Sequence, residues 1–341
     1  MLRRWVLAAV VVALVVAVGV VVLVRSLSGP SSRLAEALEL APKSAVRFSW
    51  TDWSGVRDEL GVSTSTPVAQ LLSKAYDDDL SSTSALVDSS PVLARSFDFT
   101  PANLDWELYA QGTAGAVLLM KLPDSVSGSD VRATLAKLGY ADPKSADGVW
   151  EHPNLNDLGQ VTPELTAITV DDSDHLVAAS DSAEFLGGWR GDERGSDDDA
   201  ISKVVDAVGD VRSASVYGGD YACQSLAMNQ AATADQAEGA QLLKQAGKIN
   251  PLDAFAMARE PGRDVRVAMA FESAGQARTN ADTRSRLAVG PAPGQGGTFG
   301  DRFTLGRVAA SGDVVTMELR SKPDTYVLSD LSTGPLLFAT C

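Results

Sequence analysis

The stretch SAVRFSWTDW, residues 44–53, decides most of what the sequence predicts about the fold. Apolar and polar residues alternate along it, as in a β-strand, so Val46, Phe48 and Trp50 fall on one face. Trp50 and Trp53 fall on opposite faces, and a sheet covered on one side only cannot bury both rings. We expect core and rim packing for the tryptophans beyond the N-terminal run. The alternative is a groove that binds sugar or lipid, lined by Trp50, Trp53, Trp106, Trp150 and Trp189.

Three later segments repeat the order of three earlier ones. The strand at residues 44–53 is matched by SASVYGGDY, the apolar run AGAVLLMKLP by DVRVAMAFES, and the hairpin ITVDDSDHLVAAS by RVAASGDVVTMELRS. This repeated order predicts two divergent α+β halves, residues 33–210 and 211–341. One irregular α+β domain without duplication is the alternative, and both interpretations give a mixed α+β fold.

Capping and turn residues place the other elements. Helices are expected over residues 33–42, 67–76, 127–139, 196–209 and 232–247. Ser129 should cap the third helix and Gly139 should end it, while Thr233 and Gln236 should form a capping box at the start of the fifth. Hairpin turns are expected at residues 112–115, 172–174 and 311–313, and the glycine-rich residues 290–300 should form a flexible loop that does not pack.

The N-terminal region predicts a membrane anchor. The twenty residues from Trp5 to Val24 carry no polar side chain, and a helix of that length spans about 30 Å, the thickness of a bilayer's hydrocarbon core. Arg3 and Arg4 precede the run, so the positive-inside rule places the N-terminus in the cytoplasm and the rest outside. We therefore predict a tip and transmembrane helix at residues 1–25, and a linker at 26–32.

Two other interpretations of this run remain open. One is a cleaved signal peptide, because Ser26 and Ser28 loosely fit a cleavage site, although the apolar run exceeds the usual length. The other is a core helix of a cytosolic protein, which the lack of any polar face argues against. A membrane anchor and a cleaved signal peptide would both export the bulk of the chain. The anchor would also keep it at the membrane as a single-pass protein.

The two cysteines, Cys223 and Cys341, fit an exported chain. In an oxidising compartment a pair of cysteines is expected to form a disulfide. The bond would tie the C-terminus to the middle of the chain, and the preceding PLLFAT is expected to pack as a terminal strand. The alternative is two unpaired thiols, with Cys223 in the core and Cys341 dangling.

Charge and motifs narrow the function. Net charge is −15, and −18 beyond the three arginines of residues 1–25, so nucleic acid is not an expected partner. The two histidines, His152 and His175, belong to no zinc or triad motif, and no cofactor or metal site is predicted. Acidic clusters at residues 77–79, 171–174 and 197–199 match no EF-hand and are interpreted as turns and helix starts, with weak calcium binding as the alternative.

The sequence resembles a group of exported proteins. The opening ALELAPKSAVRFSWTDW, after a single anchor and a short Ser/Gly linker, and the segment LVAASDSAEF after a hairpin are similar to membrane-anchored actinobacterial proteins of unknown function. The resemblance implies an extracytoplasmic location and transfers no catalytic residue.

Taken together, we predict a cell-envelope interaction or ligand-binding module, which is not an enzyme. A carrier that holds a lipid or other apolar ligand, and an envelope hydrolase that uses a pair of carboxylates, are the alternatives. The expected partners are the membrane, through Trp5 to Val24, and an envelope protein or an apolar ligand.

Overall fold

A computed structural model describes residues 32–145, 148–189 and 194–341. The expected anchor and most of the linker lie outside the described residues; the linker's last residue, Ser32, caps the first described helix through a hydrogen bond from the Ala35 amide. No helix within the described ranges has the length and apolar character needed to cross a membrane.

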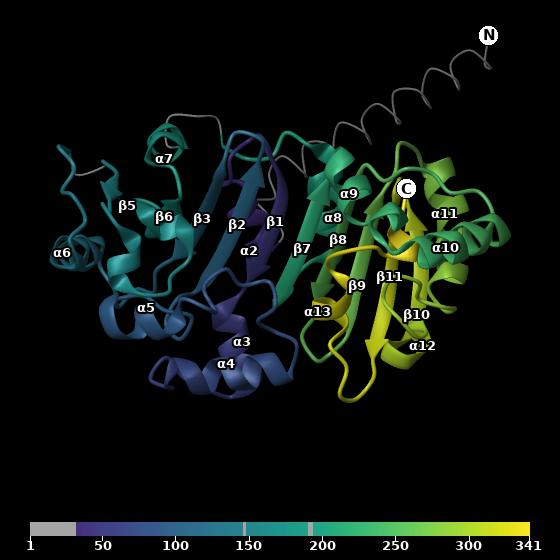
Figure 1. Ribbon diagram of the computed structural model, residues 1–341, viewed down its shortest axis with the longest axis horizontal. Coiled ribbons are helices and arrows are strands. Elements are labelled where there is room, and N and C mark those ends of the chain that lie inside the picture. Colours follow the sequence, from purple (N-terminus) through teal and green to yellow (C-terminus); the bar gives the residue numbers. More distant parts are fainter. Residues whose placement is uncertain (1–31, 146–147, 190–193) are drawn as a thin grey trace, which may run out of the picture.

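One antiparallel sheet runs the length of the molecule (Figure 1). Its eleven strands lie in the order β10-β11-β9-β8-β7-β1-β2-β3-β6-β5-β4. Their bounds are β1 Ala45–Thr51, β2 Trp106–Gly112, β3 Ala116–Lys121, β4 Trp150–Glu151, β5 Ala167–Asp171, β6 Leu176–Ser180, β7 Ser213–Gly218, β8 Ala254–Arg259, β9 Val265–Ala270, β10 Phe303–Ser311 and β11 Val314–Ser321. The predicted strand and all three predicted hairpins are confirmed.

The strands occur in two runs of the same connectivity. The order β1-β2-β3-β6-β5 recurs as β7-β8-β9-β11-β10, and a helix precedes the first strand of each run. The two runs meet through β1 and β7, which pair antiparallel. Both therefore belong to one sheet, and the division into halves at residue 210 stays a prediction.

One face of the sheet has a single core that crosses both runs. Three helices cover this face: α2 Arg33–Leu38, α7 Ala183–Trp189 and α8 Asp199–Val208. Phe48 and Trp50 of β1 pack in this core beside Val216 of β7 and Ala256 of β8. The predicted face is thus confirmed for Phe48 and Trp50. Val46 is only partly buried, and Ala45 packs in the core in its place, because the register with β2 shifts between Ala45 and Arg47.

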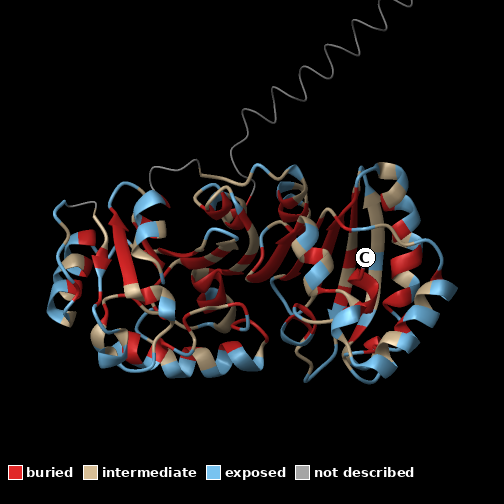
Figure 2. Ribbon diagram, turned by 45° about the horizontal axis from the view of Figure 1, so that its top comes forward, coloured by how far each residue is buried: buried red, intermediate tan, exposed pale blue. Residues whose placement is uncertain are grey.

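The other face has two separate cores. Over the first run the core is closed by α3 Trp53–Leu60, α4 Val68–Asp77, α5 Ser90–Ser96 and α6 Gly128–Leu138. Over the second run it is closed by α9 Gly219–Ser225, α10 Thr233–Ala246, α11 Ala274–Leu287, α12 Phe299–Arg302 and α13 Val327–Leu331. Figure 2 shows that the strands are largely buried, while the outer sides of the covering helices are exposed. Trp50 and Trp53 are therefore both buried, because the sheet is covered on both sides.

Two helix starts differ from the prediction. Ser127, not Ser129, caps α6, and it forms a capping box with Asp130. The box expected at Thr233 does not form, because Thr233 is already inside α10 and the Gln236 amide bonds to the carbonyls of Asn229 and Ala231. Gly139 and Gly247 end their helices as predicted.

Two apolar segments also fold differently. Residues 290–300 were expected to stay unpacked, but Ala292 and Phe299 are buried in the second core. The expected terminal strand is wrong: Leu337–Ala339 form a 3₁₀ helix (η4). A short apolar run does not distinguish a strand from a buried helical turn.

Candidate functional site

The two cores on the second face are separated by polar side chains of the central strands. Directly paired residues of β1 and β7 share a face, so Arg47 lies with Tyr217, Ser49 with Ser215, and Thr51 with Ser213. Their neighbours on the first face are apolar throughout. A sheet covered on both sides normally has apolar residues on both faces. This polar strip departs from that pattern, and such departures are expected at functional sites.

Three adjacent cavities lie along this strip. Their volumes are about 310, 330 and 480 Å³. The first two share Ser82, Ser84 and Ala85 as lining residues, and the last two share Arg47, Tyr217 and Thr333. We call the row of three the junction groove. Its lining is rich in hydroxyl groups. They come from Tyr76, Ser81, Ser82, Ser84, Tyr326 and Ser329 at one end, and from Ser49, Thr83, Tyr109, Thr162, Ser215, Tyr217, Tyr221, Ser225, Ser332 and Thr333 farther along.

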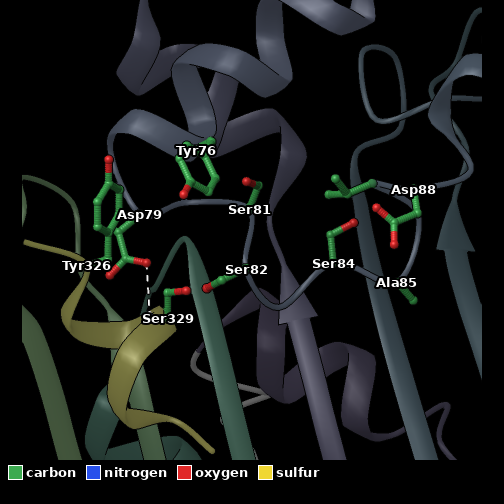
Figure 3. Close-up of a pocket in the computed structure, with 10 residues that line it drawn as sticks. Tyr76, Asp79, Ser81, Ser82, Ser84, Ala85, Asp88, Tyr326 and Ser329 are labelled. Atoms are coloured by element: carbon green, nitrogen blue, oxygen red, sulfur yellow. Dashed lines mark hydrogen bonds between the residues drawn. The ribbon is translucent and has the colours of Figure 1, made fainter. Parts of the chain in front are cut away.

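The first end of the groove is closed by a contact between the two runs (Figure 3). Asp79 follows α4, and its carboxylate accepts hydrogen bonds from the amides of Leu328 (2.7 Å) and Ser329 (3.1 Å) of α13. The rings of Tyr76 and Tyr326 lie 5.3 Å apart beside it. Burial raises the pKa of Asp79 to about 6, although the two amide donors and Arg259 oppose the shift.

The segment over the middle of the groove, residues 80–86, is held by buried polar groups. Thr83 donates to the Trp50 carbonyl (2.7 Å), and Ser213 donates to the Leu80 carbonyl (2.6 Å). Glu107 of β2 accepts from the Ala85 amide (2.8 Å) and from the Trp53 indole (3.1 Å). Desolvation raises the pKa of Glu107 to about 7 despite these donors. The carboxylate lies beneath the segment and takes no part in lining the cavities.

Arg47 lies at the shared wall of the two larger cavities. Its Nη1 donates to Gln111 Oε1 (3.3 Å), and its Nε is buried without a hydrogen-bond partner among the described residues. Tyr217, opposite Arg47, donates its hydroxyl to the Ser332 carbonyl (2.7 Å) and packs 5.6 Å from the Tyr221 ring. Burial raises the pKa of both Tyr109 and Tyr217, the charge of Glu164 adds to the rise at Tyr109, and Arg47 opposes the rise at both.

Ion pairs fix the two runs to each other near one end of β1 and β7. Glu59 of α3 accepts from Arg212 Nε (3.1 Å), from Arg259 Nη2 (3.3 Å) and from the Gly262 amide (3.2 Å). Arg259 is 1% exposed, so this carboxylate compensates a buried charge. These ion pairs therefore hold the helices and strands on the two sides of the groove in a fixed position.

The predicted cysteine pair lies outside the groove. Cys223 of α9 and Cys341 are at disulfide distance, with Cα atoms 5.3 Å apart. The bond joins α9 to the residues after η4, where Arg284 also donates to the carbonyls of Phe338 (2.8 Å) and Thr340 (2.9 Å). The predicted pair of cysteines is thus present, but Cys341 follows a 3₁₀ helix in place of a strand.

The other residues singled out from the sequence have structural roles. The five tryptophans from Trp50 to Trp189 are buried, as expected for core packing. His152 contacts the Leu138 carbonyl, and His175 contacts the Pro123 carbonyl. Within the described ranges, no group of three or more His, Cys, Asp or Glu side chains is placed to hold a metal ion.

The acidic clusters likewise occupy turns, helix starts and contacts between elements. Asp171 accepts from the Ser173 and Asp174 amides in the turn between β5 and β6. Asp198 caps α8, and Asp79 bonds to the start of α13.

The groove residues were missed in the sequence, although a signal for them was present. Arg47, Ser49 and Thr51 alternate with the apolar residues of β1, and Ser213, Ser215 and Tyr217 do the same in β7. In isolation such alternation indicates a strand with a solvent face. Only the pairing of β1 with β7, between two covered regions, turns that face into the floor of a groove.

Comparison with known proteins does not assign the chain to a family. No family model and no curated protein matches it. Crystal forms I, III and IV of the protein TP0453 are similar in structure, with TM-scores of 0.40, 0.39 and 0.41 at 10% identity. Each match covers 86% of this chain and 96% or 97% of the other. A likeness at this level carries no information about ligand or activity.

Proposed function

We propose that the chain is a membrane-anchored, extracytoplasmic protein whose α+β region binds a hydroxyl-rich ligand, such as an oligosaccharide, in the junction groove. One observation carries this proposal: the cores over the two runs of strands part above Ser49 and Ser215, and the cavities between them are lined by hydroxyl groups. A hydroxyl can both donate and accept, which matches a ligand with many hydroxyls of its own.

The aromatic residues of the groove support the same ligand class. Tyr109, Tyr221 and Tyr326 are partly exposed, and Tyr76 is 64% exposed. A tyrosine offers an apolar ring face together with a polar tip, which suits the C–H face and hydroxyl edge of a sugar. An apolar ligand has less support, because the lining alternates Ser, Thr and Gln with these rings. Among the described residues, the large hydrophobic side chains that are well exposed are Tyr76 and Val289.

The location rests on two features. The apolar run from Trp5 to Val24 predicts an anchor with the N-terminus inside, and the Cys223–Cys341 pair suits an oxidising compartment. Protease added to intact cells that carry a tag at the C-terminus tests this topology. The tag should be digested without lysis, and protection until lysis would contradict an extracytoplasmic location.

Binding is tested with the full chain in detergent on an array of oligosaccharides. Ser49→Trp should fill the groove floor and abolish binding, whereas Ser125→Trp, at an exposed turn, should leave binding unchanged. Both variants are compared with the wild type in thermal unfolding, so that loss of the fold is recognised. Unchanged binding in a folded Ser49→Trp variant, or no binding by the wild type, would contradict the proposed function.

A further inference from the structure

Resting on the proposed function, we infer that the ligand of the junction groove is an anionic saccharide, whose carboxylate or phosphate group pairs with Arg47. Among the described residues that line the three cavities, Arg47 is the one cation. Two of these cavities share it, so a ligand in either would meet its guanidinium.

The surroundings of Arg47 leave its charge uncompensated. The guanidinium bonds to the neutral amide oxygen of Gln111, and within the described part of the chain it forms no ion pair with a carboxylate. Other partly or fully buried arginines near the junction do have such partners: Arg212 pairs with Asp52 and Glu59, and Arg259 pairs with Glu59. A half-buried cation beside neutral groups is costly, and an anion supplied by a ligand would remove that cost.

Two of the three carboxylates that line the groove, Asp79 and Asp88, belong to the one cavity that Arg47 does not line. Asp79 is bonded to the amides of α13 at the far end. Glu164 lines the same cavity as Arg47, but it accepts the hydroxyl of Thr162 and no ion pair joins it to Arg47. Two of the three lining carboxylates therefore lie in the cavity beside Tyr76, and Glu164 shares the middle cavity with Arg47 without an ion pair among the described residues.

The residues around Arg47 fit the remainder of such a ligand. Tyr217 lies opposite Arg47 in the strand register, and Tyr109 and Tyr221 lie on the same cavities. A guanidinium presents a planar fork that bonds a carboxylate or phosphate through two N–H groups, which lysine cannot reproduce. An arginine among tyrosines and serines therefore recognises the acidic group, and the rings and hydroxyls recognise the sugar.

The test compares the full chain in detergent with three probes: a tetramer of hexuronic acid, the matching neutral hexose tetramer, and a hexose phosphate. Titration calorimetry should give the wild type at least about tenfold tighter binding of an anionic probe than of the neutral one, the effect of one good charge-assisted pair. Arg47→Gln should abolish this preference, so that the anionic probes bind the folded variant no more tightly than the neutral tetramer does. Arg47→Lys should keep part of it, and Arg307→Gln, at an exposed position of β10, should keep all of it.

Each outcome decides one point. Tighter binding of hexuronate identifies a carboxylate, and tighter binding of hexose phosphate identifies a phosphate; either supports the inference. Equal binding of neutral and anionic probes, or an anionic preference that survives in folded Arg47→Gln, overturns the inference and leaves the proposed function standing. Failure of all three probes to bind, together with a negative oligosaccharide array, overturns both.

Discussion

Ser49 of β1 and Ser215 of β7 are paired directly across the strands that join the two runs, at the middle of a register of five pairs. The equivalent connectivity of the runs makes this pair the local centre of an approximate twofold arrangement. Both side chains are small, so the layers above them part and leave the groove. The junction groove thus lies where the first strands of the two runs meet.

The Cys223–Cys341 bond should stabilise the C-terminal segment. The cysteines are 118 residues apart in the sequence, and closing so long a loop constrains the unfolded chain. Cys341→Ser should lower the free energy of unfolding by about 2–4 kcal/mol under oxidising conditions. Chemical denaturation with and without reductant measures this. Cys223→Ser should behave alike and the double variant no worse; equal curves for variant and wild type would contradict the prediction.

Arg284, which does not line the groove, should contribute strongly to the stability of the fold. It is fully buried, and burial lowers its pKa to about 9. It donates to the carbonyls of Phe338, Thr340 and Asn250, so Arg284→Met leaves buried acceptors unpaired. We expect a loss of about 2–4 kcal/mol in unfolding free energy and faster amide exchange in residues 335–341.

A matched control is Arg286→Met. Arg286 lies on the same helix and donates to one carbonyl, that of Ala246. Its loss should cost no more than about 1 kcal/mol. Equal losses of unfolding free energy in the two variants would show that the hydrogen bonds of Arg284 do not specifically stabilise the C-terminal segment.

Glu59 should fasten the two runs of strands together. Glu59→Gln removes the carboxylate that pairs with buried Arg259 and with Arg212, and we expect about 1–3 kcal/mol of destabilisation, since Glu59 is partly exposed. Glu318→Gln, which loses a partly exposed pair with Arg320, should change stability by less than about 0.5 kcal/mol. Urea unfolding of both variants checks the difference, and similar midpoints would contradict it.

The sequence predicted local elements better than their arrangement. Alternation identified β1 and the hairpins, because a strand's two faces are visible in four or five residues. It could not show that β1 pairs with β7, because that pairing joins residues far apart in the chain, and the groove depends on it. The prediction of an unpacked loop at residues 290–300 was wrong for a related reason. Ala292 and Phe299 are buried through tertiary contacts that the local sequence does not reveal. At α6, Ser127 and Ser129 are both suitable caps, and the Asp130 side chain selects the first.

Stability should fall as pH rises through the range in which Glu107 ionises. The group is fully buried, and its pKa rises from 4.5 to about 7, so the folded state holds the proton more tightly than the unfolded state does. The unfolded chain therefore loses its proton first, and between about pH 4.5 and 7 the free energy of unfolding should decrease. Glu107→Gln cannot titrate, so the difference in stability between wild type and variant isolates this group. That difference should shift against the wild type by about 1–3 kcal/mol from pH 4.5 to pH 8. Denaturation at a series of pH values measures it, with Glu318→Gln as a partly exposed control. A difference that is flat, or that favours the wild type as pH rises, would show that Glu107 ionises in the fold as readily as it does in water.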